Sequence, residues 1–294
     1  MAVYKRTYQG YTGPLTPEWS RFAIIPRYAY QRLFKSKIMT AFYIICFISP
    51  LVFLSLIYTA SSFGSIAKMF GATDARSPIT VNGQFFFSYL GAQCPLSFIL
   101  TAFVGPGLIS DDLSNRALTL YLARPFSRVE YVIGKMSVLL ILLSSITWVP
   151  GLILFGVQAM LAGGGWLWQN LWLAWAIFAG CWIWILVYAL AALALSAWVK
   201  WKVAAGALLV GIFFVAAGFG HAINAVLDVN WGKLLDLGFV FGVVWNRLFR
   251  LERLFHGSGT ADVSPASAWF ILALICASSL WLLYRKLRAV EVVR

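Results

Sequence analysis

Long apolar stretches alternate with short polar segments along most of the chain. The stretches cover about 39–60, 85–109, 131–160, 170–199, 203–226 and 267–284. A helix needs ~20 apolar residues to cross the hydrocarbon of a bilayer, and each stretch is near or above that length. A further run, Leu234–Trp245, is too short to cross and indicates a re-entrant or interfacial piece. The pattern therefore predicts six transmembrane helices.

The composition agrees with this pattern. The chain is 61% hydrophobic and only 11% charged, whereas soluble domains carry roughly 25% charged residues. We therefore expect an all-α polytopic membrane protein in which residues 39–284 form the transmembrane domain.

The basic residues predict how this domain is oriented. Six spans place both termini on one side, and 17 of the 23 Lys and Arg residues fall on that side. Basic residues are enriched in cytoplasmic segments, so both termini are predicted to be cytoplasmic, including the basic tail 285–294. The net charge of +13 is then explained by topology and by attraction to anionic lipids, and it requires no nucleic acid.

Residues 1–38 predict a cytoplasmic tail that contains an amphipathic helix in the membrane interface. Thr16-Pro17-Glu18 is typical of a helix start, and Pro26 should break or bend the helix. One helical face would carry Trp19, Phe22, Ile25, Ala29 and Leu33. Such a face suits a helix lying on the bilayer surface.

The densest polar segment lies between the second and third spans. Leu108–Lys135 carries seven of the chain's 33 charged residues in 28 positions. Within it, Ser114–Leu122 can form a short helix, and Arg124-Pro125 should stop it. Ser127 and Glu130 have the spacing of a capping box at the start of the third span. Residues 110–130 are therefore predicted to form a rigid protrusion rather than a flexible linker.

Two further features concern the fifth span and the outer loop that follows it. The fifth span contains two pairs of small residues at a spacing of four, Ala207/Gly211 and Ala216/Gly220. Such pairs let helices approach closely, either within the chain or between two copies. The outer loop 227–266 should contain short helices, one of them an interfacial helix over Trp245–Phe255.

Few residues in the sequence form motifs typical of catalytic or metal-binding sites. The cysteines lie inside predicted spans without a CxxC spacing, and neither histidine belongs to a metal-binding motif. No phosphate-binding G-x-x-x-x-G-K-[ST] and no G-x-S-x-G occurs. The sequence thus predicts no metal site and no catalytic site on this chain, and any energy source would belong to another protein.

The layout and the charged loop resemble the membrane subunits of type 2 ABC transporters, the ABC exporter permeases. The residues that carry the resemblance are Ile109-Ser110-Asp111-Asp112, Ala117-Leu118-Thr119-Leu120-Tyr121-Leu122, Arg124-Pro125, Ser127-Arg128 and Gly134-Lys135. They are similar to the family's acidic turn, short helix, proline and "S-R" and "G-K" pairs leading into the third span. Arg116-Ala117 stands where the commoner family form has Gly-Thr.

The resemblance implies a permease in the bacterial inner membrane that works as a dimer with cytoplasmic P-loop ATPase subunits. ATP and Mg²⁺ would bind to the ATPase, and this chain would need no cofactor of its own. The loop between spans 2 and 3 would be a coupling helix that docks on the ATPase. The implied docking residues are Asp111, Asp112, Ser114, Asn115, Arg116, Leu118, Tyr121, Arg124, Pro125 and Arg128, with the N-terminal interfacial helix contributing to the same contact.

Two other functions stay open at this stage. A membrane-embedded enzyme, or a scaffold subunit of an envelope complex, could use the polar groups Asp228, His256 and Asp262 on the outer side. A carrier driven by an ion gradient is disfavoured, because the spans nearly lack the ionisable groups that bind coupling ions. The sequence does not determine the substrate. It also does not determine whether the chain exports a substrate or transmits mechanical force, or whether it pairs with itself or with a paralogue.

Overall fold

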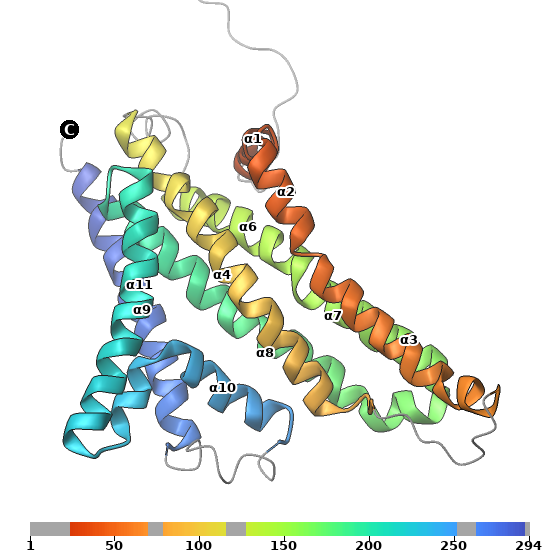
Figure 1. Cartoon of the computed structure of the whole chain (residues 1–294). Coiled ribbons are helices and arrows are strands. Elements are labelled where there is room, and N and C mark those ends of the chain that lie inside the picture. Colours follow the sequence, from red (N-terminus) through yellow and green to blue (C-terminus); the bar gives the residue numbers. More distant parts are fainter. Residues whose placement is uncertain (1–23, 70–78, 116–127, 252–262, 292–294) are drawn as a thin grey trace, which may run out of the picture.

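The computed structural model describes residues 24–69, 79–115, 128–251 and 263–291, which form helices and no strands. The elements are α1 (Ile24–Leu33), α2 (Lys37–Ile45), α3 (Ile48–Met69), α4 (Gly83–Ser114), α6 (Arg128–Ile146), α7 (Trp148–Ala162), α8 (Gly164–Trp198), α9 (Lys202–Leu227), the 3₁₀ helix η2 (Trp231–Leu235), α10 (Leu237–Leu248) and α11 (Pro265–Glu291). Figure 1 shows the long helices running side by side as a bundle.

Six segments of the described chain are long and apolar enough to cross a membrane, which confirms the six predicted spans. The protein is therefore a multi-pass membrane protein. Two of the spans are each built from two helices, α2 with α3 and α6 with α7. The sequence pattern placed these two spans but did not predict that each would be divided into two helices.

Prolines explain both interruptions. Pro50 and Pro150 lack the N–H that would bond the carbonyl four residues earlier, so the carbonyls of Cys46 and Ile146 lose their helical donor. The side chain of Gln93, on α4, supplies the missing bonds. Its fully buried Nε2 donates to the Cys46 carbonyl at 3.0 Å and also to the Ile146 carbonyl. One side-chain amide on the second span thus donates to the carbonyls that the helix breaks in the first and third spans leave without a backbone donor.

Helix α8 is the most buried of the six spans and forms the centre of the bundle. Glycines bring its neighbours close to it. A Cβ on Gly105 of α4 would lie 2.6 Å from the Cβ of Ala192, and one on Gly151 of α7 would lie 2.8 Å from Ile177 Cγ2. Both distances are too short for a real contact, so these helices pack at a separation that only glycine permits.

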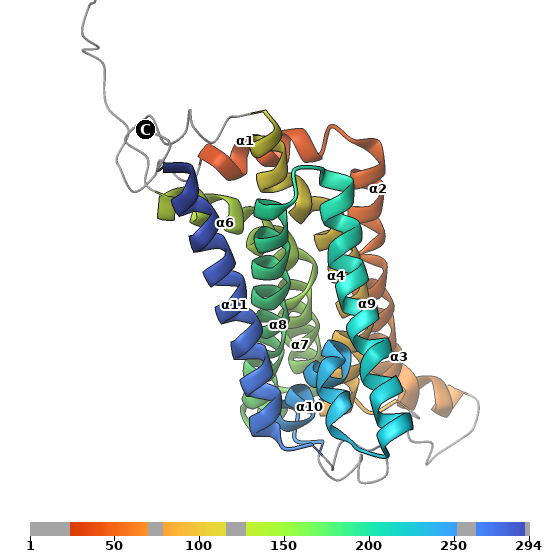
Figure 2. The same cartoon turned by 90° about the vertical axis from the view of Figure 1, so that its left-hand side faces the viewer.

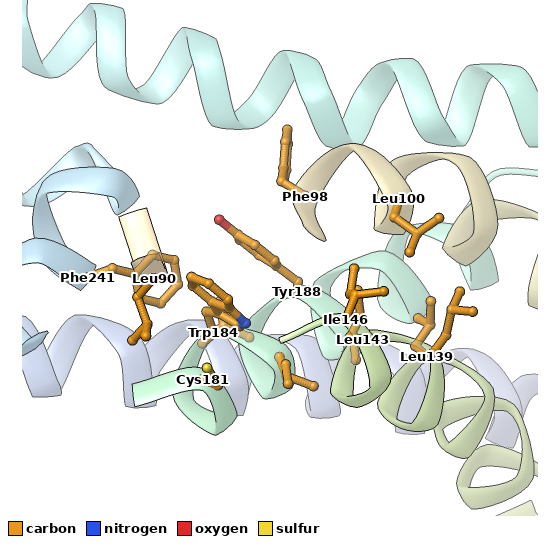
Figure 3. Close-up of a cluster of buried hydrophobic side chains, with 14 of the residues drawn as sticks. Leu90, Phe98, Leu100, Leu139, Leu143, Ile146, Cys181, Trp184, Tyr188 and Phe241 are labelled. Carbon is orange, nitrogen blue, oxygen red and sulfur yellow. The ribbon is translucent and has the colours of Figure 1, made fainter. Parts of the chain in front are cut away.

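Large side chains fill the space around α8. Figure 3 shows Cys181, Trp184 and Tyr188 of α8 among apolar side chains from α4, α6 and α10. The ring of Tyr188 lies 5.3 Å from that of Phe98 and 5.6 Å from that of Phe241, centroid to centroid. Aromatic pairs at such separations stabilise a core beyond the apolar area that they bury.

The segment after α9 folds back against the bundle rather than crossing it. Asp236 caps α10, since its Oδ1 accepts hydrogen bonds from the backbone N–H groups of Gly238 and Phe239. The predicted helix over Trp245–Phe255 is wrong in its described part. Helix α10 ends at Leu248, and Trp245 is buried, donating from Nε1 to the Gly180 carbonyl at 3.1 Å.

The bundle has two distinct ends. Figures 1 and 2 show α1 lying across one end, together with the last turns of α4, α8 and α11 and the starts of α6 and α9. Helix α10 lies toward the opposite end. We refer to these as the α1 end and the α10 end. Helix α4 ends and helix α6 begins at the α1 end, and residues 116–127 between them lie outside the described residues.

Candidate functional site: the charged end of the bundle

The last turns of α4 are held by a serine from α8. The hydroxyl of Ser196 donates to the Pro106 carbonyl at 2.6 Å and accepts from the backbone N–H groups of Ile109 and Ser110, each at 3.0 Å. A side chain inserted into the helical hydrogen bonds in this way fixes the direction of the helix locally. The backbone of the residues that follow, Asp111 and Asp112, is thereby held in a fixed position.

Both carboxylates form ion pairs with basic side chains of neighbouring helices in the same chain. Asp111 Oδ2 lies 2.8 Å from Nη2 of Arg32 on α1. Asp112 Oδ2 lies 2.7 Å from Nζ of Lys135 on α6 and accepts a hydrogen bond from the Tyr131 hydroxyl at 2.7 Å. The end of α4 is therefore connected by charge to α1 on one side and to α6 on the other.

The two ion pairs differ in burial. The side chains of Lys135 and Asp112 are 9% and 15% exposed, whereas that of Arg32 is 72% exposed. A buried pair excludes water, and losing one partner leaves an uncompensated charge. A pair with one exposed member is screened and contributes little. The Asp112–Lys135 pair is therefore the stronger structural link.

Helix α1 is also held by a neutral contact. The hydroxyl of Tyr30 donates to the Val138 carbonyl of α6 at 2.8 Å. Burial raises the pKa of Tyr30 well above its ordinary value, with a further contribution from Tyr43. The hydroxyl is consequently protonated, and able to donate, at any physiological pH. Three of the residues predicted for the apolar face of this helix, Ile25, Ala29 and Leu33, pack in or against the core.

The structure places the predicted loop residues in two groups. Asp111, Asp112, Ser114 and Asn115 belong to the end of α4, so the expectation that Ser114 begins a separate helix was wrong. The carbonyl of Asp111 accepts from the Ser114 hydroxyl at 3.0 Å and from Asn115 Nδ2 at 2.8 Å, which ends the helix.

The second group lies largely outside the described residues. It comprises Arg116, Leu118, Tyr121, Arg124, Pro125, Ser127 and, on the N-terminal segment, Trp19 and Phe22. In the described chain α6 runs from Arg128, and Glu130 lies in its first turn. Position 127 lies outside the described residues, so the capping box of Ser127 and Glu130 stays a prediction.

The two small-residue pairs of α9 have different surroundings. Gly220 is buried, and a Cβ there would collide with the Gly232 carbonyl of η2, so this glycine serves packing within the chain. A Cβ on Gly211 would meet nothing within 4 Å, and Ala207 is exposed. The Ala207/Gly211 pair is thus open to lipid or to another protein.

Several residues of this end escaped the sequence prediction. Arg32, Tyr131 and Lys135 were not recognised as partners of the acidic pair, and Ser196 was not recognised as the residue that holds the end of α4. The spacing of Tyr131 and Lys135 by four places them on one helical face, which was the one available signal.

The α10 end offers a second cluster. His221 Nε2 lies 3.5 Å from Asp236 Oδ2. Asp236 also borders an apolar cavity of about 350 Å³ between α4, α8, α9 and α10. No group of three or more His, Cys, Asp or Glu side chains that could hold a metal ion occurs within the described ranges.

Comparison with known proteins assigns no family to this chain. No protein-family model matches it, and no curated protein does.

Proposed function

We propose that this chain is the membrane-spanning permease subunit of an ATP-driven ABC transporter, with export as its direction. Two permease subunits would enclose the pathway, and separate cytoplasmic P-loop ATPase subunits would hydrolyse ATP with Mg²⁺. The α1 end would face the cytoplasm of a bacterial cell, in line with the excess of basic residues there.

The observation that carries the proposal is the way in which the charged segment between α4 and α6 is anchored. Its two flanking helices are joined directly by the Asp112–Lys135 ion pair and by the Tyr131 hydrogen bond to the same carboxylate. A docking element can transmit motion into a bundle only if its attachment points are firm. The contacts of Asp112 supply such attachment on both sides of residues 116–127.

This geometry refines the roles of the acidic pair. Asp111 and Asp112 would position the docking segment through Arg32 and Lys135 rather than contact the ATPase themselves. The direct contacts would then come from the segment beyond Asn115, with Arg116 as the charged one. Helix α1 would lie in the interface beside it, with its exposed Arg27 and Arg32 toward the aqueous phase.

A dimer fits the exposure of the outer helices. Helices α3, α9 and α11 are the least buried of the spans, and α9 carries the open Ala207/Gly211 pair. We assign that face of α9 to contact with the second permease copy, because small residues permit close helix approach in a bilayer.

The test is a charge reversal in the docking segment. Arg116→Glu should weaken co-purification of the ATPase at least several-fold, while the permease stays folded and inserted. Lys200→Glu is the matched control, since Lys200 is an exposed cation in the α8–α9 connection at the same end. Undiminished association of the Arg116→Glu protein, or an equal loss in the control, would contradict the docking assignment.

A further inference from the structure

A cavity of about 340 Å³ lies at the α1 end between α1, α2, α4, α6 and α9. Its lining is divided into an apolar part and a charged part. The apolar part includes Ile25, Leu33, Met39, Val104 and Leu108. The charged part consists of Arg32, Asp111, Asp112, Lys135 and Lys202.

The charges of this lining do not cancel. Three cations face two carboxylates, and both carboxylates are already paired, Asp111 with Arg32 and Asp112 with Lys135. Within the described chain, Lys202 has no carboxylate within 4 Å. The cavity therefore carries one surplus positive charge, located on Lys202.

The position of Lys202 is set by a glycine. A Cβ on Gly107 would lie 3.3 Å from both Cδ and Cε of Lys202, so the lysine stem lies directly over this gap in α4. The same Cβ would lie 3.5 Å from Asp111 Oδ2, which places the ammonium group near the Asp111–Arg32 pair. Arg32 is largely exposed and has guanidinium N–H groups beyond the one that faces Asp111.

The cavity lies at the level where a bilayer's headgroups would be. Helix α9 begins at Lys202, directly after the exposed Trp201, and Trp198 is exposed nearby. Exposed tryptophans mark the interface of a membrane protein. One and two turns further into the span from Gly107, α4 exposes Phe103 and Ile99. The exposed surface of α4 thus offers apolar side chains to acyl chains deeper in the bilayer.

We propose that this cavity binds the headgroup phosphate of an anionic phospholipid. Lys202 and the free N–H groups of Arg32 would contact the phosphate, and the apolar lining would cover the glycerol and the first methylenes. A free phosphate ion would leave the apolar half of the cavity uncovered. A zwitterionic headgroup would place its own cation beside Lys202, so a lipid with net negative charge is selected. The proposal does not depend on the proposed transport function.

The test measures lipid binding to the full-length chain in mild detergent by native mass spectrometry. Dioleoyl phosphatidylglycerol should bind as a first, tightest lipid, ahead of dioleoyl phosphatidylcholine. Lys202→Gln should weaken that first binding roughly fivefold, the effect of one basic residue near an anionic headgroup. Lys200→Gln, two residues away and outside the cavity, should leave it unchanged, and Lys202→Arg should retain it.

Three results would overturn the proposal. Equal binding of the two lipids would remove the selectivity, and an equal effect of Lys200→Gln would show attraction to the general basic surface. Competition by millimolar glycerol phosphate would indicate a site for small anions rather than for lipid. Co-purification of an ATPase is scored separately, so failure of the lipid site and failure of the transport proposal are distinguishable.

Discussion

Gln93 places a fully buried amide beside two backbone carbonyls, and both carbonyls lack a helical N–H donor because a proline lies four residues later. Its Nε2 has two hydrogens, and each has a carbonyl acceptor, on Cys46 and on Ile146. Its Oε1 has no hydrogen-bond partner in the described structure. An amide that satisfies two helix breaks at once is costly to replace, because hydrocarbon offers no substitute donor.

Replacing this amide should destabilise the bundle. Gln93→Leu would leave two buried carbonyls without a donor, so we expect a loss of about 1–3 kcal/mol in the free energy of unfolding. Unfolding in mixed micelles by denaturing detergent measures this. The control is Gln84→Leu, an exposed glutamine on the same helix, which should change stability by less than about 0.5 kcal/mol. Equal effects of the two variants would contradict the assigned role of Gln93.

The acidic pair provides a second comparison between neighbouring residues. Asp112→Asn removes the partner of the buried Lys135, and we expect a loss of about 3 kcal/mol in stability. Asp111→Asn removes the partner of the exposed Arg32 and should cost less than about 1 kcal/mol. The same unfolding assay ranks them. A larger effect at Asp111 would mean that the burial of the two pairs does not determine their strength.

At the scale of the elements, the close approach of α4 to α8 determines how the charged end is held. Gly105 contacts Ala192 one turn before Ser196 inserts into α4. Gly105→Ala should destabilise the bundle by about 1–3 kcal/mol, because the added methyl group has no space. Gly91→Ala on the same helix should be neutral or stabilising, since nothing lies within 4 Å of that Cβ.

A second-site change tests the mechanism of this effect. Ala192→Gly removes the methyl group that the new side chain would meet, so the double variant should recover most of the loss. A double-mutant cycle measures the coupling between the two positions. Additive effects would show that Gly105→Ala acts through something other than the contact with Ala192.

The sequence pattern predicted the spans but not their interruptions, for reasons that differ between elements. The breaks before Pro50 and Pro150 have a local cause, since each proline frees the carbonyl four residues earlier. The compensating Gln93 is distant in sequence from both breaks, and hydrophobic periodicity contains no information about such a contact. Trp245 was predicted to begin an interfacial helix, but it is buried against the ring of Trp184 and donates a hydrogen bond to the Gly180 carbonyl.

The location of the charged site was predictable from the sequence, but the contacts within it were not. The density of charges drew attention to Leu108–Lys135, and two residues of this stretch, Asp112 and Lys135, form the buried ion pair. The inward orientation of Asp111 and Asp112 was not predictable, because it depends on side chains of two other helices, Arg32 of α1 for Asp111 and Lys135 and Tyr131 of α6 for Asp112. Residues 116–127 remain a prediction, as they lie outside the described part.

At the scale of the whole molecule, the placement of α1 and the end of α11 at one end of the bundle agrees with an even number of spans. The excess of basic residues predicts that this end is cytoplasmic. A fluorescent protein that folds only in the cytoplasm, fused after Arg294, should therefore fluoresce, and a fusion within 252–262 should not. The reverse pattern would contradict the orientation and, with it, docking on a cytoplasmic ATPase.

The central claim is that this chain works with a separate ATPase. Affinity purification of the tagged chain from its native membranes in mild detergent, with mass spectrometry of the co-purifying proteins, tests it most directly. The account predicts a P-loop ATPase in stoichiometric amount. Recovery of the folded chain with no ATPase would contradict the account and favour a scaffold or enzyme role.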